Sequence, residues 1–312
     1  MTICSIAVFT ELGKNFEIRS IPTHVPQKGE VLIKNHAIAT NPADKLIQQT
    51  GFFVQEYPAV IGFDVAGTVE AVLYALVFPS FIQVGEGVTR FKKGDKVLGL
   101  ASIPFNTRKG AFQEYTIVDE HYAGLVCSFA NSFFSPFQMP DNVSFEEGSA
   151  LIAPTITTAS SLFVDLAIPK PTSHKRPPIS KDAEVFYVNS AASAVGAAAV
   201  QLLAICGFRV IATASPKNFD LIKSFGASDV FDYNDAELVQ KVKTAAGTKI
   251  NLAFDAASND DSFRKSIEIL EGTGNLVFVK PSALNLEKKN VNSILANYSK
   301  IVDVCVFLKL RF

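Results

Sequence analysis

The sequence predicts an α/β protein in which a small β-rich domain precedes a doubly wound parallel sheet. Its 312 residues exceed the usual size of one domain, and 48% hydrophobic residues supply material for two cores. Short β-branched segments separated by glycines fill residues 1–122, whereas strands and helices alternate regularly from about residue 184. Such alternation is typical of βαβ units with parallel strands. We therefore expect one domain over residues 1–150 and a second over residues 151–312.

The N-terminal part is typical of a small β-barrel or sandwich, because its strands are short and separated by turns. A helix interrupts them: Asn41 has the side chain of an N-cap, Pro42 suits the first helical position and Asp44 the third. This helix is expected to end at Gly51. The expected strands lie within residues 31–40, 59–72, 91–100 and 111–119.

The C-terminal part begins with a helix over residues 141–167, which Ser144 and Glu147 start with the spacing of a capping box. A segment rich in proline and lysine, residues 168–182, is expected to be an exposed loop. Elements then alternate. The expected strands are 184–190, 208–215, 229–233, 250–256 and 275–280, with helices at 193–207, 217–227, 235–247 and 260–272.

Composition excludes several classes of protein. The 29 basic and 30 acidic residues nearly cancel, which argues against a nucleic-acid-binding surface. No apolar run approaches the roughly 18 residues of a membrane helix, and the N-terminus lacks the pattern of a signal peptide. The 4 cysteines are far apart, so neither a disulfide framework nor a structural zinc site is expected. We expect a cytoplasmic protein that binds neither nucleic acid nor membrane.

The first strand-to-helix turn of the C-terminal part predicts a dinucleotide site. Between Ser190 and Gly196 the positions of a G-x-G-x-x-G motif hold Ala191, Ser193 and Gly196, all small enough for close approach of a pyrophosphate. The following helix N-terminus, with Ala194 and Val195, presents free N–H groups to phosphates. An ordinary alanine-rich turn is the alternative.

The second strand indicates which nicotinamide cofactor is bound. NAD sites usually carry an acidic residue near its end, about 20 residues after the glycine motif, and none is present here. Ser215 offers a hydroxyl and Lys217 a positive charge that suit a 2′-phosphate, with Asn218 beside them. Tyr233, at the end of the third strand, adds a hydroxyl or a stacking face. The pattern favours NADP(H), unless Lys217 is only a solvated lysine.

These residues and several longer stretches resemble the medium-chain dehydrogenase/reductase superfamily. The branch of zinc-free quinone oxidoreductases and fungal trans-acting enoyl reductases is the most similar. The resemblance implies a GroES-like catalytic domain and a Rossmann domain, with the nicotinamide in the cleft between them. Asp255, Ala256 and Val279 complete the expected cofactor-binding set. The matching stretches are HAIATNPADK (36–45), VIGFDVAGTV (60–69), GVTRFKKGDKV (87–97), GAFQEY (110–115), PDNVSFEEGSAL (140–151), SAVGAAAVQL (193–202) and ATASPKNFDLIKSFGASDVFDY (212–233).

Zinc-dependent members of this superfamily have a His-Glu pair where this chain has Phe63 and Asp64, and a four-cysteine lobe that is missing here. Without such ligands a tetrahedral zinc site is not expected. The resemblance instead implies hydride transfer to an activated C=C bond of a small molecule: an enone, a quinone or an enoyl thioester. Dimers are common in the family, so a homodimer is an open alternative to a monomer.

Two further groups of residues follow from the resemblance. Asn41, Asp44 and Lys45 match the nicotinamide-side segment of the catalytic domain, where Lys45 is a candidate proton donor to an enolate. Its alternative is a surface lysine. Thr157, Thr158 and Ser161 match the helix that borders cofactor and substrate. Their alternative is packing or bonding to the helix backbone.

Three features depart from the family. Residues 72–83 and 124–138 are uncharged insertions, and removing each restores the family's usual text. We interpret them as introns translated in frame, with genuine apolar loops as the alternative. The family continues beyond the point where this chain stops, so we expect a truncated C-terminus, with 302–312 as a last strand. The open alternatives to an active reductase are a non-enzymatic NADPH-binding protein and an inactive, mis-spliced product.

Overall fold

A computed structural model describes residues 3–27, 29–70, 72–73, 82–83, 91–101, 104–119, 139, 142–171, 173, 175–180, 182–280 and 291–295. The described chain forms two compact units, one reaching Ala153 and the other beginning at Pro154. Most of both expected insertions, and the strand expected at 302–312, lie outside the described residues. Each unit has its own buried core.

The first unit is built from antiparallel sheets, as the short strands and glycine turns predict. One sheet has four strands in the order β7-β4-β3-β8, and a second pairs β1 with β2. Val31, Ile33, Val65 and Val97 pack into a core on one face of the larger sheet. The strands are β1 (Ile3–Val8), β2 (Glu17–Pro22), β3 (Glu30–Ala39), β4 (Asp64–Glu70), β5 (Val72–Leu73), β6 (Ile82–Gln83), β7 (Lys96–Leu100) and β8 (Tyr115–Asp119).

Helix α1 (Pro42–Thr50) confirms the capping pattern of its sequence. The Asp44 carboxylate accepts a hydrogen bond from the Asn41 N–H at 2.6 Å. Gly51 ends the helix in the left-handed region, and its N–H bonds to the carbonyl of Ile47. The apolar side of α1 is anchored by Ile47, which packs with Phe9 and Phe105.

Helix α2 (Phe145–Ser160) begins with the expected capping box, since the Glu147 side chain accepts from the Ser144 N–H and the Ser144 hydroxyl from the Glu147 N–H. The α-helix ends at Ser160 and does not continue to residue 167 as expected. A π-helical segment, η1 (Ser161–Asp165), follows directly. π-Helical segments are rare overall, but those that occur often lie at functional sites.

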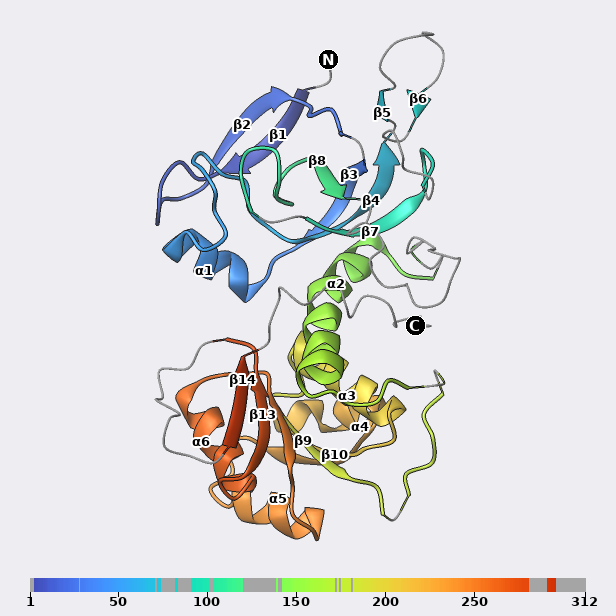
Figure 1. Cartoon of the computed structure of the whole chain (residues 1–312), viewed down its shortest axis with the longest axis vertical. Helices are drawn as coiled ribbons and strands as arrows, with labels where there is room; N and C mark the ends of the chain where they lie inside the picture. Colours follow the sequence, from blue (N-terminus) through green and yellow to red (C-terminus); the bar gives the residue numbers. More distant parts are fainter. Residues whose placement is uncertain are drawn as a thin grey trace. The chain divides into compact units, whose positions relative to one another are not determined.

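The second unit contains one parallel sheet in the order β11-β10-β9-β12-β13-β14. Helices α3 and α4 lie on one face of this sheet and α5 and α6 on the other, the doubly wound arrangement (Figure 1). Tyr187, Ile211 and Leu276 face α5 and α6 in a closed core. The strands are β9 (Val185–Asn189), β10 (Arg209–Ala214), β11 (Ala227–Asp232), β12 (Leu252–Asp255), β13 (Gly274–Phe278) and β14 (Val291–Leu295). The helices are α3 (Ala194–Ile205), η2 (Pro216–Asn218), α4 (Phe219–Phe225), α5 (Leu238–Ala246) and α6 (Asp260–Ile269).

The structure differs from the expected elements in a few places. Strands β1, β2 and β14 were not predicted, and the strand expected over 59–72 begins only at Asp64, after a loop. In that loop Ala59 forms an isolated bridge with Phe9. Helix α5 begins three residues later than predicted, since Asp235 and Glu237 form a turn in which the Asp235 carboxylate accepts from the Glu237 N–H.

Candidate cofactor-binding site

The cofactor residues expected from sequence follow consecutive strands of the parallel sheet. The first group follows β9, the second follows β10, and the remaining residues end β12 or come directly after β11, β12 and β13. Because the carboxyl ends of parallel strands meet at one edge, the sheet order brings these positions together. They are Ser190, Ser193, Ala194, Val195 and Gly196 after β9, Ser215, Lys217 and Asn218 after β10, and Tyr233, Asp255, Ala256 and Val279.

The turn after β9 is tight. Ser190 has φ +57°, a left-handed conformation that is uncommon for a residue other than glycine. Its carbonyl accepts from both the N–H and the hydroxyl of Ser193, at 3.0 and 2.9 Å. A Cβ at Gly196 would lie 2.3 Å from the same carbonyl oxygen, so only glycine allows this approach of helix to turn.

The start of α3 suits an anion. The Ser193 hydroxyl caps the helix by accepting from the Gly196 N–H at 3.1 Å, so its oxygen and proton are both engaged within the turn. The N–H groups of Ala194 and Val195 precede the first helical hydrogen bond, which Ala197 donates to Ser193. These two N–H groups, at the positive end of a 12-residue helix, are therefore the phosphate donors that this turn offers.

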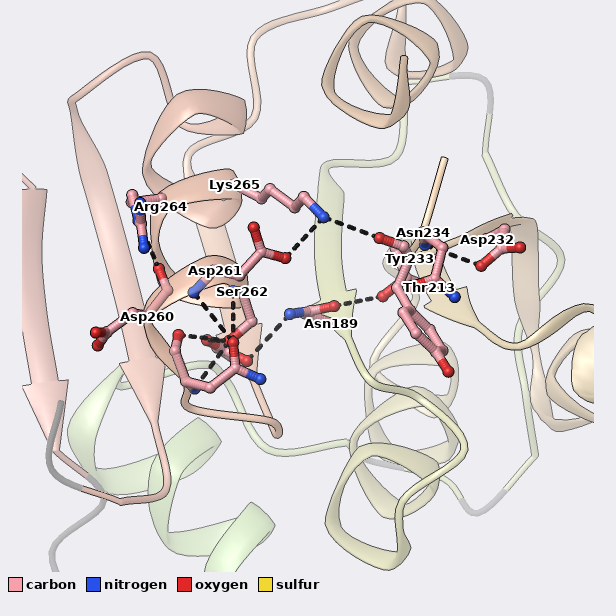
Figure 2. Close-up of polar contacts among 12 residues, drawn as sticks. Asn189, Thr213, Asp232, Tyr233, Asn234, Asp260, Asp261, Ser262, Arg264 and Lys265 are labelled. Atoms are coloured by element: carbon pink, nitrogen blue, oxygen red, sulfur yellow. Dashed lines mark hydrogen bonds and ion pairs between the residues drawn. The ribbon is translucent and has the colours of Figure 1, made fainter. Parts of the chain in front are cut away.

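The end of β10 carries polar and basic groups and no acid. The Ser215 hydroxyl accepts from the Asn218 amide at 3.1 Å, which leaves its proton for another acceptor. Lys217 is exposed and makes no ion pair or hydrogen bond within the described residues. Tyr233 exposes 42% of its surface, and its carbonyl accepts from the Lys265 ammonium at 3.0 Å (Figure 2). These groups fit the 2′-phosphate side of NADP(H).

Asp255 lies below this edge rather than on it, because its side chain has no exposed surface. One carboxylate oxygen accepts from the Asn189 amide at 3.2 Å and from the N–H groups of Ala257 and Ser258, both at 3.0 Å. The other accepts from the Ser262 hydroxyl at 2.6 Å (Figure 2). Burial raises the pKa of Asp255 above its usual value, and these donors offset only part of that rise. Asp255 thus connects the carboxyl ends of β9 and β12 below the edge of the sheet.

The backbone groups beside Asp255 are engaged as well. The N–H of Ala256 donates to the Asn189 carbonyl at 3.2 Å, and the N–H of Val279 donates to the Ser258 hydroxyl at 2.9 Å. Neither N–H is therefore available to a ligand in this geometry. What Ala256 and Val279 can offer a cofactor is carbonyl oxygen and van der Waals surface.

The three polar residues expected beside the substrate are all buried. The Thr158 hydroxyl donates to the Val195 carbonyl at 3.0 Å and so fixes the first turn of α3. Thr157 is 5% exposed, and Ser161 has no exposed surface. The Ser161 hydroxyl has no hydrogen-bond partner within the described residues, at the point where the π-helical segment begins.

In the first unit, Asp44 and Asp64 form a buried carboxyl pair, and two of the three expected catalytic residues, Asn41 and Asp44, belong to this arrangement. The Asn41 amide donates to one oxygen of Asp64 at 2.9 Å, and the Ala153 N–H donates to the other at 3.0 Å. Asp44 accepts from the Asn41 N–H through one oxygen, while its other oxygen is buried without a partner in the described chain. Burial is the main cause that raises the pKa of Asp44 to about 6 and that of Asp64 to about 7.

Asp64 was not predicted as a site residue. Sequence reasoning considered it only as the counterpart of a zinc-binding pair, because nothing in its own segment indicates that it contacts Asn41, 23 residues earlier. The signal available was an acidic residue inside an apolar run, VIGFDVAG, which a buried strand tolerates only with hydrogen-bond partners. Lys45, the expected proton donor, is exposed on α1 and makes no ion pair in the described part of the chain.

Comparison with known proteins identifies the family. The model of the alcohol dehydrogenase GroES-like domain matches residues 27–127, and the model of the zinc-binding dehydrogenase matches residues 194–310. The dehydrogenase orsE of Emericella nidulans is 33% identical over 289 residues, which cover 88% of this chain and 77% of that protein. The chain belongs to the medium-chain dehydrogenase/reductase superfamily of oxidoreductases.

Two further proteins are similar to this chain. The trans-enoyl reductase fsa3 of a Fusarium species is 35% identical over 242 residues, 75% of this chain, which spans only 58% of that relative's length. A mycobacterial protein solved in complex with NADPH shares the fold, with a TM-score of 0.69 and 22% identity over 97% of this chain and 84% of that one. The GroES-like and Rossmann assignments of the two units are thus confirmed.

The second matching family is described as a zinc-binding dehydrogenase, so the metal-ligating side chains of this chain are relevant. Among the described residues, no three His, Cys, Asp or Glu side chains are grouped so that they could hold a metal ion. The buried pair Asp44 and Asp64 offers two carboxylates, and Phe63 beside Asp64 has no ligating atom. No described helix is both long and apolar enough to cross a membrane.

Proposed function

We propose that this chain binds NADPH and, without zinc, reduces the C=C bond of an enone, a quinone or an enoyl thioester. The observation that carries the proposal is the edge of the parallel sheet, where the free N–H groups of Ala194 and Val195 lie next to a strand end that offers Ser215 and Lys217 in place of an acid. An acid there would bond a ribose 2′-hydroxyl and repel a 2′-phosphate. The relatives named trans-enoyl reductases support the reaction class.

In this proposal the bound cofactor supplies a hydride to the β-carbon of the alkene, and the chain's own residues do the rest. Ala194 and Val195 hold phosphate, and Ser215, Lys217 and Asn218 hold the 2′-phosphate, with Tyr233 beside the adenosine. The Lys45 ammonium stabilises the developing enolate and delivers the proton that completes the reduction. The buried hydroxyl of Ser161, which has no partner among the described residues, is a candidate hydrogen-bonding group for the substrate.

Cofactor choice tests the proposal first. NADPH and NADH are titrated separately, following nicotinamide fluorescence, with Lys217→Ala compared against Lys223→Ala, which removes an exposed lysine from the other end of α4. We expect Lys217→Ala to weaken NADPH binding about tenfold and to leave NADH unchanged, since one charge-assisted contact is worth about 1.5–3 kcal/mol. Lys223→Ala should change neither. A chain that binds neither nucleotide contradicts the proposal.

The reaction is tested next, by NADPH oxidation against a panel of enones, quinones and enoyl thioesters. We expect turnover with at least one of these classes, at full rate after treatment with a zinc chelator. Lys45→Ala should lower kcat without changing the affinity for NADPH, because the proposed role of Lys45 is proton transfer. Binding of NADPH without oxidation by any class would favour a non-enzymatic NADPH-binding protein.

A further inference from the structure

The turn that precedes α3 is held by one residue of the neighbouring strand. Thr213, at the end of β10, has no exposed surface and bonds to two consecutive N–H groups of the turn. Its carbonyl accepts from the Ala191 N–H at 2.8 Å, and its hydroxyl accepts from the Ser190 N–H at 3.1 Å. The second of these bonds restrains Ser190 in its left-handed conformation, which the isolated backbone disfavours.

The hydroxyl of Thr213 can accept from Ser190 because its proton has a fixed destination. The same hydroxyl donates to the side-chain oxygen of Asn189, the last residue of β9 (Figure 2). A hydroxyl has one proton, so donating it to Asn189 directs a lone pair toward the Ser190 N–H. The orientation of the Asn189 amide therefore favours the acceptor role of the Thr213 hydroxyl toward Ser190.

That orientation is set by Asp255. The carboxylate oxygen that faces Asn189 already accepts from two backbone N–H groups, those of Ala257 and Ser258. It acts as an acceptor there, so the Asn189 amide presents its N–H to Asp255 and its oxygen to Thr213. The direction of each hydrogen bond, from donor to acceptor, is thus determined from β12 through β9 and β10 to the turn. We call the four residues that these bonds connect, Asp255, Asn189, Thr213 and Ser190, the relay.

From this geometry we infer that Thr213 is a positioning residue for nicotinamide dinucleotide binding, which it supports through the relay without touching the ligand. The inference rests on the proposed function for its ligand, but the relay itself concerns only this chain. The turn it restrains carries the Ala194 and Val195 N–H groups and the close contact of Gly196 with the Ser190 carbonyl. Phosphate donors that are already ordered before binding raise affinity, because no ordering entropy remains to be lost.

Three variants separate this role from a general contribution to folding. Thr213→Val keeps the shape and removes the hydroxyl, whereas Thr213→Ser keeps the hydroxyl. Ser262→Ala removes a different hydroxyl bonded to Asp255, beyond the relay, and leaves the contacts of Ser190 intact. Thermal unfolding of all three shows how much stability each hydroxyl supplies.

The first measurement does not depend on a cofactor. Amide hydrogen exchange of Ser190 is compared in the wild-type chain and the variants. We expect the exchange rate to rise about five- to tenfold in Thr213→Val and to stay near the wild-type rate in Thr213→Ser and Ser262→Ala, since one hydrogen bond of about 1–1.5 kcal/mol protects this group. An unchanged rate in Thr213→Val overturns the inference.

The second measurement is the dissociation constant for NADPH, by fluorescence titration. We expect Thr213→Val to weaken NADPH binding about five- to tenfold, with Thr213→Ser restoring it and Ser262→Ala within about twofold of wild type. Equal losses in Thr213→Val and Ser262→Ala would mean a structural role only and would overturn the inference. A wild-type chain that binds no NADPH contradicts the proposed function, while the exchange of Ser190 still decides whether the relay orders the turn.

Discussion

The two units bury aspartates in opposite ways. In the second unit, Asp255 is surrounded by donors, with the Asn189 amide, two backbone N–H groups and the Ser262 hydroxyl all within 3.2 Å. In the first unit, Asp64 has two donors and Asp44 one, and burial together with the charge of Asp44 raises the pKa of Asp64. Asp64 and Asp255 are equally inaccessible. The difference lies in the number of donors.

The contrast distinguishes a carboxylate that stabilises its surroundings from a carboxyl pair that can take up a proton. A carboxylate that accepts from four donors stabilises the arrangement around it. A buried carboxyl pair with an unpartnered oxygen is poorly solvated as an anion and prefers to hold a proton near neutrality. We therefore expect the second unit's aspartate to respond to substitution, and the first unit's pair to respond to pH.

The same substitution at the two sites is expected to give the largest difference. Asp255→Asn removes the negative charge that four donors share and turns an amide N–H toward the Ser262 hydroxyl, so these charge-assisted hydrogen bonds weaken, and we expect a loss of about 2–3 kcal/mol in the free energy of unfolding. Asp64→Asn removes a poorly solvated charge and keeps an oxygen for the Ala153 N–H, so we expect a change within about 1 kcal/mol. Urea unfolding at pH 8 measures both, and equal losses would contradict the comparison.

Much of this contrast could not be predicted from the sequence. Strand and helix alternation predicted five strands of the parallel sheet and the four helices that follow them, since local periodicity and caps such as Ser193 determine these elements. Strand β14 was missed because VNSIL is short and half polar. The ends of the parallel strands were predicted to carry the cofactor residues, but their contacts were not, because Thr213 and Asp255 act through neighbours in space.

The first unit gives the same lesson for single residues. Asn41 and Asp44 could be placed at the start of α1 from capping rules alone. Their link to Asp64 depends on how β4 runs beside β3, which local sequence does not encode. Likewise, the hydroxyl of Ser193 looks like a phosphate ligand in the sequence, and in the structure its proton and acceptor are both used within the turn.

The pH dependence of stability should distinguish the two units next. Because the folded-state pKa values of Asp44 and Asp64 lie above those of the unfolded chain, the folded form holds protons that unfolding releases. Their contribution is fully present below about pH 4 and is lost as the pH rises to about 7. Asp64→Asn removes part of this loss, so the variant should gain stability relative to wild type between pH 5 and 8.

The measurement is thermal or urea unfolding of both proteins at several pH values, at constant ionic strength. Glu56→Gln, which removes an exposed carboxylate of the first unit, provides the control and should follow the wild-type curve within about 0.5 kcal/mol. Parallel curves for wild type and Asp64→Asn would mean that the carboxyl pair stays ionised in the folded chain, and would remove the distinction from Asp255.

The smallest expected effect comes from two hydroxyls near the end of α2, which repeat the contrast within one helix. Thr158 donates to the Val195 carbonyl, whereas the equally buried hydroxyl of Ser161 has no partner in the described chain. Thr158→Val should lower the free energy of unfolding by about 1 kcal/mol, and Ser161→Ala should leave it unchanged or raise it by a few tenths of a kcal/mol. If Ser161→Ala also raises KM for the alkene without changing KM for NADPH, its hydroxyl finds its partner in the substrate. An unchanged kcat/KM for the alkene would mean that Ser161 serves only the π-helical turn, because a group that binds substrate cannot be removed without a change in kcat/KM.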